Sequence, residues 1–418
     1  MSNETVTTSI DTPTEAGNYA TIVNDTINGK ASLLNKLGQY LWDNPELRFE
    51  ETKAHDYITQ YLESEGFKVQ RHYILPTAFR AEFGGNTEQG PTAVIMCEYD
   101  ALPNLGHACG HNLIAECSVA AGIAVKEVLQ QDSSLEGNVV VLGTPAEEGG
   151  QGKVYLLEKG AFDGADVAVM AHPTTVNVAC PITSALARIS VKYEGATAHA
   201  GAAPWDGINA LDAAVGAYVN VSLLRQQMKP EWRATGIVQE GGTVSNLIPD
   251  KSQLEFTIRA PNINELKSLQ TKVQACLISA ADATGCTSVI EMASPSVEEL
   301  ISNKTMGQIY QKYAEDFGLV FDSSNDETSG GSTDAGSVSH VIPVIHPFYK
   351  LNTTATNHTA AYADATHTQE SYDTTLAVAK ALALTALDVL RDPEVLKSIK
   401  DEFNAEIKRK MTATLSKL

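Results

Sequence analysis

The sequence predicts an α/β protein with a smaller α+β module inserted into it. Apolar segments without alternation, such as residues 93–97 and 139–143, are typical of strands buried on both faces of a sheet, and helical segments separate them. From about residue 183 the order becomes β-α-β-β-α-β, which is the ferredoxin-like arrangement, and α/β material then resumes. The length of 418 residues suits two domains rather than one.

The first part of the chain alternates helices with strands. A polar, acidic lead at residues 1–18 is expected to be disordered. The helix that starts after it stops at Asn44-Pro45, and Gly66 ends the next one. The predicted helices cover residues 19–42, 51–65, 113–130 and 153–159, and the predicted strands cover residues 68–73, 78–83, 93–99, 139–143 and 167–170.

The inserted module and the segment after it complete the chain. The module is predicted to hold strands 187–193, 233–239, 251–259 and 288–292 with helices 206–228 and 263–284. It is followed by helix 304–317, strand 341–345, helix 371–391 and an amphipathic tail from residue 393. We therefore expect one domain from residues 19–184 and 297–418, and a second domain at residues 185–296.

Composition limits the function. The formal net charge of -21 argues against nucleic acid or anionic membrane as a partner, because like charges repel. The charge is compatible with cationic substrates, although solubility is the simpler explanation. The six cysteines are too widely spread for a disulfide framework. The start lacks the apolar core of a signal peptide, and no run reaches membrane-spanning length, so we expect a soluble, cytoplasmic protein.

Polar, ligand-type side chains follow three successive apolar strands. Asp100 follows the first, Glu147 and Glu148 the second, and His172 the third. In open α/β sheets ligands bind outside the carboxyl ends of the strands, so these residues predict a site there. The loop at residues 98–112 adds a cysteine and two histidines, and its Gly110 allows a sharp turn between Cys109 and His111.

These residues fit a metal site, but each has a simpler interpretation. Cys109 with His111 suits zinc and its neighbours, whereas an isolated cysteine is more often a packing residue. Glu147 and Glu148 could divide metal binding and proton transfer between them, or form a solvated acidic turn. His172 could ligate metal or cap its strand. Sequence spacing says little about His358.

The motifs together resemble the family-20 metallopeptidases, di-metal amidohydrolases that include aminoacylases, dipeptidases and glutamate carboxypeptidases. Within that family the chain is similar to the auxin-conjugate and hippurate hydrolase subfamily, amidohydrolase subfamily D. It is more similar still to the branch that hydrolyses Xaa-Arg and β-alanyl-lysine dipeptides, with which it shares Asn112 where the auxin-conjugate branch has Asp. The motifs that carry the resemblance lie at residues 44–51, 98–112, 145–150, 171–173, 195–200, 225–230, 245–249, 331–334 and 381–389.

The resemblance implies a di-metal aminopeptidase-like catalytic domain with a mixed sheet and flanking helices. It also implies that the inserted module is a lid through which the protein forms a homodimer. Two divalent ions are implied; we expect zinc, with manganese or cobalt as alternatives. The metal ligands implied by the resemblance are Cys109, which bridges the ions, and His111, Glu148, His172 and His358.

The resemblance also implies roles in catalysis. Glu147 matches the general base and Asp100 the acid that orients a ligand. His199 and Asn246 match lid residues that reach the reacting carbonyl, from the partner subunit of a dimer. Arg259 either pairs with a substrate carboxylate or has only a strand-end role.

Three functions follow as alternatives. The first is hydrolysis of a peptide or amide bond in small substrates by a metal-bound hydroxide, with dipeptides that end in a basic residue as the expected class. The second is hydrolysis of N-acyl amino acids or conjugates in specialised metabolism. The third is a non-catalytic metal-binding scaffold, which the intact set of ligand residues argues against.

Overall fold

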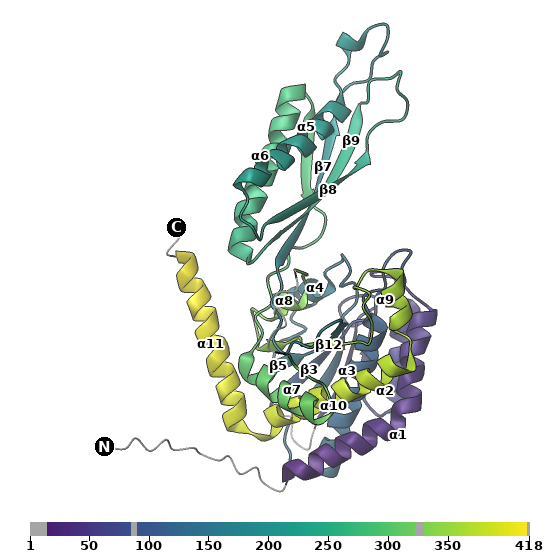
Figure 1. The fold of residues 1–418 in the computed structure, drawn as a ribbon, viewed down its shortest axis with the longest axis vertical. Helices are drawn as coiled ribbons and strands as arrows, with labels where there is room; N and C mark the ends of the chain where they lie inside the picture. Colours follow the sequence, from purple (N-terminus) through teal and green to yellow (C-terminus); the bar gives the residue numbers. More distant parts are fainter. Residues whose placement is uncertain (1–14, 85–89, 323–329, 416–418) are drawn as a thin grey trace, which may run out of the picture.

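The computed structural model describes residues 15–84, 90–322 and 330–415. A larger α/β part carries a smaller module that stands on it, and the chain passes between the two parts near α4 (Gly152–Glu158) and α8 (Ala335–Val338) (Figure 1). Residues 1–14 of the expected disordered lead lie outside the described residues. Residues 15–18 instead open helix α1 (Glu15–Asp43), which therefore starts earlier than expected.

A mixed six-stranded sheet forms the centre of the larger part. Its spatial order is β1-β2-β4-β3-β5-β11; the last four are parallel to one another, and β2 is antiparallel to both β1 and β4. The carboxyl ends of β4, β3 and β5 therefore meet at one edge. The strands are β1 (Lys68–Arg71), β2 (Phe79–Gly84), β3 (Thr92–Cys97), β4 (Asn138–Gly143), β5 (Val167–Val169) and β11 (Val344–Ile345).

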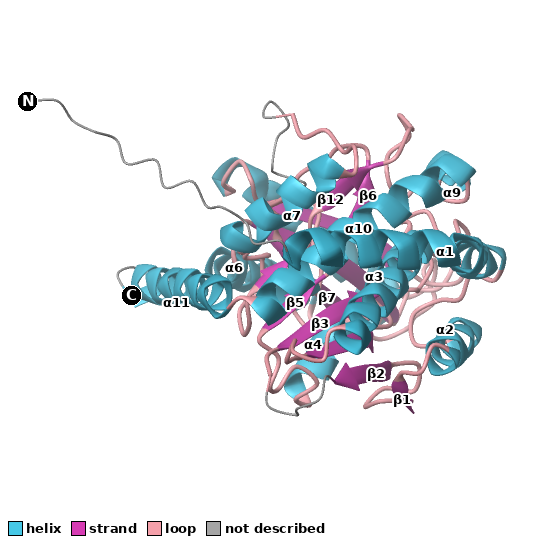
Figure 2. Ribbon diagram, turned by 90° about the horizontal axis from the view of Figure 1, so that it is seen from below, coloured by secondary structure: helices cyan, strands magenta, loops and turns pink. Residues whose placement is uncertain are grey.

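Both faces of this sheet are buried. Along β3, Ala93 and Ile95 pack into one hydrophobic cluster, whereas Val94 and Met96 pack into another. The first cluster includes α1, α3 (His111–Gln131) and α10 (Gln369–Arg391), which contact one another over the sheet (Figure 2). Helix α3 is buried on nearly all sides, and its small alanine side chains permit this close packing. Helix α2 (Thr52–Ser64) lies at the periphery, whereas α7 (Lys304–Asp316) packs against α10.

The smaller module has the predicted ferredoxin-like order. Its four strands are antiparallel, in the spatial order β10-β7-β9-β8, and its two helices share one apolar core with the sheet. We refer to it as the lid. Its elements are β7 (Ala185–Glu194), α5 (Ala210–Leu223), β8 (Arg233–Glu240), β9 (Lys251–Ala260), α6 (Ile263–Thr284) and β10 (Thr287–Met292).

Two predicted elements are wrong in extent. The helix predicted at residues 206–228 is only α5, because the Asn209 side chain accepts the N–H groups of Leu211 and Asp212 and caps the helix there. Short 3₁₀ turns at Pro204–Asp206 and Leu224–Gln227 flank it. The strand predicted at residues 341–345 shrinks to β11, since the N–H groups of Val341 and Ile342 bond back to the carbonyl of Val338 as a turn.

Three features were not predicted from the sequence. They are a two-stranded parallel ribbon of β6 (His172–Thr174) and β12 (Phe348–Lys350), and the short helices α8 and α9 (Ala360–Ala365). The amphipathic tail is helix α11 (Pro393–Leu415), which projects from the larger part (Figure 1). All six cysteines are free, as expected from their spacing. Among the described residues, no helix combines the length and apolarity needed to span a membrane.

Candidate metal centre

The candidate site lies at the carboxyl edge of the sheet, where four chain segments meet. Three of them follow β3, β4 and β5, as the strand-end pattern predicted. The fourth is the loop at residues 357–359, which is tied to the first by the bond from the His358 N–H to the Ala108 carbonyl, 2.8 Å. The Asn357 amide also donates to the carbonyls of Cys109 and Pro173. These backbone contacts bring a late loop beside residues far earlier in the chain.

The structure brings together all five side chains expected to ligate metal. The ligand atoms of Cys109, His111 and His172 lie within 4.8 Å of one another, and so do those of Cys109, Glu148 and His358. Within these groups Cys109 Sγ is 3.4 Å from His172 Nε2, and His358 Nε2 is 3.2 Å from Glu148 Oε1. Cys109 belongs to both groups and so lies between them.

Gly110 makes this arrangement possible. Its φ of 86° lies in the left-handed region, which glycine adopts readily. A Cβ at this position would lie 2.5 Å from Cγ of Pro173, too close for any other residue without movement. The turn that the sequence predicted from Gly110 is therefore present, and it allows Cys109 and His111 to face the same cluster.

The cluster fits a divalent cation. Nε2 of His111 and Oε1 of Glu148 are buried and make no well-formed hydrogen bond within the part of the chain that the structure describes; their nearest charged neighbours are Glu98 Oε2 at 3.3 Å and His358 Nε2 at 3.2 Å. Buried polar atoms are rarely left unpaired, so both atoms are available to a metal ion. Nitrogen, sulfur and oxygen donors in this combination suit zinc and related transition metals.

Asp100 forms contacts with two of the candidate ligand residues, His111 and Glu148. Its Oδ1 is 3.2 Å from Nδ1 of His111, on the side of the ring away from the unpaired Nε2. Its Oδ2 accepts the backbone N–H of Glu148 at 2.8 Å. A carboxylate in this position orients a metal-binding histidine and sets which ring nitrogen is protonated.

Glu147 lies beside the ligands. Its Oε2 is 4.0 Å from His111 Nε2, and its side chain lines the same cleft as Cys109, Glu148, His172 and His358. Burial, then the negative charges of Glu98 and Glu148, raise the pKa of Glu147 well above its ordinary value. A carboxylate with raised proton affinity is suited to accept and return a proton.

A buried network of ion pairs lies next to the site and was not predicted from the sequence. The Lys153 ammonium is completely buried, forms an ion pair with Glu98 and lies 2.7 Å from Oδ1 of Asp334. Glu98 Oε2 in turn is 3.3 Å from His111 Nε2. Burial opposes ionisation of Glu98, but the charges of Lys153 and His111 hold its pKa below the ordinary value. Both acids fall in motifs that carried the resemblance, which was the available signal.

The cleft over the cluster has a volume of about 690 Å³ and also carries two arginines from the lid. Arg259 Nη1 donates to Ser332 Oγ at 2.7 Å. Arg188 was not predicted; its Nη1 is buried and has no acceptor among the described residues. Both arginines line the cleft, and burial together with the charge of Arg188 lowers the pKa of Arg259. The cleft therefore combines a metal-binding edge with a cationic wall.

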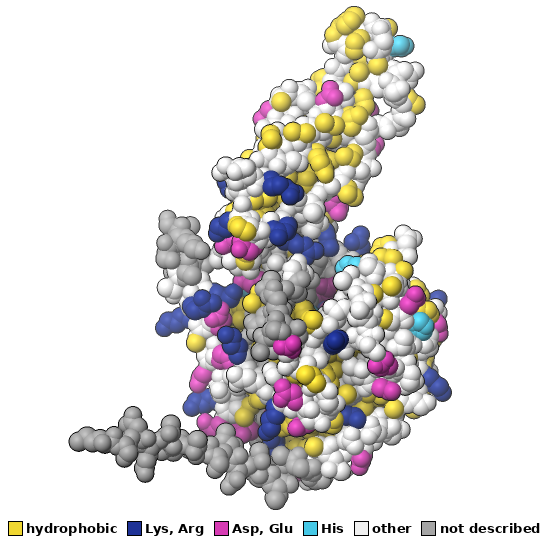
Figure 3. Space-filling model, in the orientation of Figure 1, with side chains coloured by type: hydrophobic (Ala, Val, Ile, Leu, Met, Phe, Trp, Pro, Cys, Tyr) yellow, Lys and Arg dark blue, Asp and Glu magenta, His cyan; other side chains and the backbone are white. Residues whose placement is uncertain are grey.

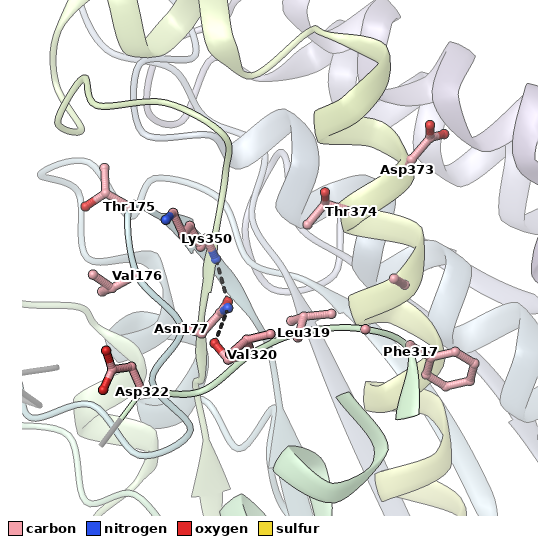
Figure 4. Close-up of a pocket in the computed structure, with 12 residues that line it drawn as sticks. Thr175, Val176, Asn177, Phe317, Leu319, Val320, Asp322, Lys350, Asp373 and Thr374 are labelled. Atoms are coloured by element: carbon pink, nitrogen blue, oxygen red, sulfur yellow. Dashed lines mark hydrogen bonds between the residues drawn. The ribbon is translucent and has the colours of Figure 1, made fainter. Parts of the chain in front are cut away.

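A neighbouring cavity of about 650 Å³ has different chemistry. It lies beside Phe317 and Leu319, and its wall at Asn177 is held by hydrogen bonds to the Lys350 N–H and the Val320 carbonyl (Figure 4). Its lining holds no histidine, cysteine or glutamate. The metal-binding cleft is therefore the candidate active site.

His199 and Asn246 do not line the cleft of their own chain. Both are exposed on lid loops, which are joined by a bridge between His199 and Leu247. Nδ1 of His199 accepts the N–H groups of Gly201 and Ala202, so the neutral ring carries its proton on Nε2. His199 is thereby prepared to donate a hydrogen bond.

The mixed sheet, the ferredoxin-like module and the donor cluster define a two-domain metallohydrolase. The chain belongs to peptidase family M20/M25/M40, whose family model matches residues 94–385. It is 46% identical over 392 residues to an Xaa-Arg dipeptidase of Mus musculus and 44% identical over 402 residues to an Xaa-Arg dipeptidase of Homo sapiens, with 91% of each chain covered in both cases.

A solved structure shows the same fold. A dinuclear metal-binding peptidase of the M20 family from Bacillus subtilis superposes with a TM-score of 0.63 and 23% sequence identity. The superposition covers 87% of this chain and 99% of the bacterial one. Both the catalytic part and the lid therefore follow an architecture already seen by experiment.

Proposed function

We propose that the protein is a metal-dependent dipeptidase that cleaves small peptides with a free C-terminal carboxylate and a basic C-terminal residue. The observation that carries the proposal is the set of five ligand side chains beside Glu147, in one cleft with two arginines. The basic residue is inferred from the two mammalian relatives named Xaa-Arg dipeptidases. The net charge of -21 is compatible with a cationic substrate.

Cys109 would be shared by two divalent ions, because it belongs both to the group with His111 and His172 and to the group with Glu148 and His358. His111 and His172 would complete one site, and Glu148 and His358 the other. We expect zinc, with manganese or cobalt as alternatives, from the donor set. Bound ions of this kind polarise a carbonyl and lower the pKa of water.

The side chains around the ligands would carry the proton transfers. Glu147 would accept the proton of the attacking water and return it to the leaving amine. Its buried carboxyl group has the raised pKa that this exchange needs. Asp100 would keep His111 in the tautomer whose Nε2 is free to ligate, through its contact with Nδ1.

The two lid arginines would recognise the substrate carboxylate. Guanidinium groups bind carboxylates through paired, charge-assisted hydrogen bonds, and Nη1 of Arg188 lacks an acceptor among the described residues. Apart from Glu147 and Glu148, no acidic side chain lines the cleft within the described part of the chain. An anionic group of the substrate would offset the repulsion between Arg188 and Arg259.

His199 and Asn246 would act from the partner subunit of a homodimer formed through the lid. The lid exposes hydrophobic side chains (Figure 3), and β8 is an edge strand of its sheet. Leu223 of α5 is 71% exposed and Ile237 of β8 is 59% exposed. Exposed apolar residues on an unpaired edge favour association with a second copy. His199 would then donate a hydrogen bond from its Nε2–H to the developing oxyanion in the neighbouring cleft.

A substrate panel tests the proposed function. The metal-loaded protein is assayed with Xaa-Arg, β-alanyl-lysine and γ-aminobutyryl-lysine dipeptides and with N-acyl amino acids. We expect higher kcat/KM for dipeptides with a basic C-terminal residue. Preference for N-acyl amino acids would instead indicate a conjugate amidohydrolase. No turnover of any member, in protein with full metal content, would favour a non-catalytic scaffold.

A further inference from the structure

The segment at residues 44–51 carried part of the family resemblance but has no role in the proposed chemistry. It packs against the turn that bears Glu147. Glu51, its last residue, is completely buried. Its Oε1 accepts the backbone N–H groups of Phe49 and Ala146, each at 2.9 Å, and its Oε2 accepts the hydroxyl of Thr77 at 2.6 Å. One carboxyl group thus joins three separate segments.

Ala146 is in a conformation that needs such support. Its φ of 62° lies in the left-handed region, where a side chain with a Cβ is disfavoured. Gly150 donates its N–H to the Ala146 carbonyl at 3.1 Å, which closes the turn. Because Ala146 immediately precedes Glu147, a change in its backbone angles would redirect the Glu147 side chain.

A second carboxylate holds the other side of the same turn. The N–H of Glu148 donates to Asp100 at 2.8 Å, and the N–H of Ala146 donates to Glu51. Glu147 therefore lies between two backbone N–H groups, each fixed by a buried acid. Asp100 has a further contact with His111, whereas the contacts of Glu51 are with Phe49, Thr77 and Ala146.

We propose that Glu51 is a positioning residue that sets the direction of Glu147 by holding Ala146 in its left-handed conformation. The proposal rests on the proposed function, in which Glu147 is the general base. Glu51 acts through the geometry of its hydrogen bonds and not through its charge. Burial and the nearby charge of Asp100 raise the pKa of Glu51 to about 7, which agrees with a neutral carboxyl group serving equally well.

Three variants at this one position separate geometry from charge. Glutamine keeps the length of the side chain and an oxygen for both N–H groups, and its amide donates to the Thr77 hydroxyl. Asp and Asn are one methylene shorter and cannot reach the same three partners. We expect E51Q to keep kcat within about threefold of the wild type, and E51D and E51N to lose about 10- to 100-fold, since small misplacements of reacting groups have effects of this size.

A loss of kcat without a change in KM would distinguish a positioning role for Glu51 from a role in substrate binding. KM and metal content should stay unchanged in all three variants, because Glu51 touches neither the cleft nor a ligand side chain.

Glu46 provides a matched control in the same segment. Its carboxylate accepts the N–H groups of Lys53 and Ala54 at the start of α2 and has no contact with Ala146. E46D should therefore lower thermal stability without lowering kcat.

The results that overturn the proposal are distinct from those that overturn the proposed function. A loss in E51Q equal to that in E51D would show that charge matters, and unchanged kcat in E51D and E51N would show that the contact is dispensable. If only one of E51D and E51N is recovered folded, comparison of its kcat with that of E51Q decides between these outcomes. E147Q tests the base assignment separately: activity in E147Q contradicts the proposed function whatever the Glu51 variants do.

Discussion

Oδ1 of Asp100 lies 3.2 Å from Nδ1 of His111, and both side chains are buried. A hydrogen bond to the carboxylate requires a proton on Nδ1, which leaves Nε2 of His111 with its lone pair toward the ligand cluster. The same acid holds the N–H of Glu148, so one side chain orients two of the five candidate ligands. This relationship supports a prepared metal site rather than a chance gathering of polar residues.

Replacing Glu147 by Gln should lower kcat by about 10²- to 10⁴-fold, which is the usual contribution of a general base. Metal content should remain that of the wild type, because the ligand side chains are untouched. Steady-state kinetics and elemental analysis of the same sample check both parts. E158Q, at an exposed position in the same region, serves as the control and should be fully active. Substantial activity in E147Q would require another base.

Replacing Cys109 by Ala should weaken the binding of both metal ions, because its thiolate belongs to both ligand groups. Replacing His358 by Ala should weaken only one. Titration calorimetry with zinc on metal-free protein measures the two stoichiometries, and C276A in helix α6 controls for loss of a thiol elsewhere. Two sites of unchanged affinity in C109A would contradict a bridging role.

Replacing Arg259 or Arg188 by Ala should raise KM for dipeptides with a free carboxylate by about 10- to 100-fold, the range for loss of a hydrogen bond to a charged group. The same dipeptides with a C-terminal amide should show no further loss in the variants, because the recognised charge is absent. Comparison of the acid and amide series in each variant provides the measurement. Equal effects on both series would indicate a structural role for the arginine.

Substituting Glu for Leu223 together with Lys for Ile237 should convert the proposed dimer to a monomer and lower activity. Sedimentation velocity measures the mass, and V320E, another exposed apolar position outside the lid, is the control.

A complementation assay tests whether His199 acts in the site of the partner subunit. Mixing inactive H199A with inactive E147Q should restore up to about a quarter of wild-type activity, because each mixed dimer has one complete site. No recovery after verified subunit exchange would place His199 outside the partner's site.

Glu116 should make the protein less stable as pH rises. It is completely buried in helix α3, and burial together with the charge of Asp373 raises its pKa well above the ordinary value of 4.5. The unfolded chain then releases this proton at lower pH than the folded one. Its contribution is therefore complete below about pH 4.5 and declines as pH rises toward the folded pKa, by about 1.4 kcal/mol per pH unit.

E116Q removes this titration. The stability of E116Q relative to the wild type should increase as pH rises above about 4.5, measured as the difference in unfolding free energy at each pH. A constant difference between E116Q and the wild type would mean that Glu116 ionises normally in the folded protein.

Some residues of the candidate site were predicted from local sequence patterns, and others were not. Asp100, Glu147, Glu148 and His172 were predicted to lie together because parallel strands end at one edge, and β4, β3 and β5 are neighbours with that polarity. His358 came only from the family resemblance, since no local spacing links it to Cys109. Lys153 looked like an ordinary helix lysine; its burial beside Glu98 and Asp334 depends on contacts between distant segments.

The α/β class, the ferredoxin-like module, the strand-end acids and the turn at Gly110 were predictable from the sequence. These features follow from periodicity and backbone preference, which are local properties. Three relationships became visible in the folded protein alone: Arg188 lines the cleft, Glu51 holds Ala146, and Asp100 reaches both His111 and Glu148. Those contacts join residues far apart in the chain, and their geometry arises from packing the whole fold, which no local pattern records.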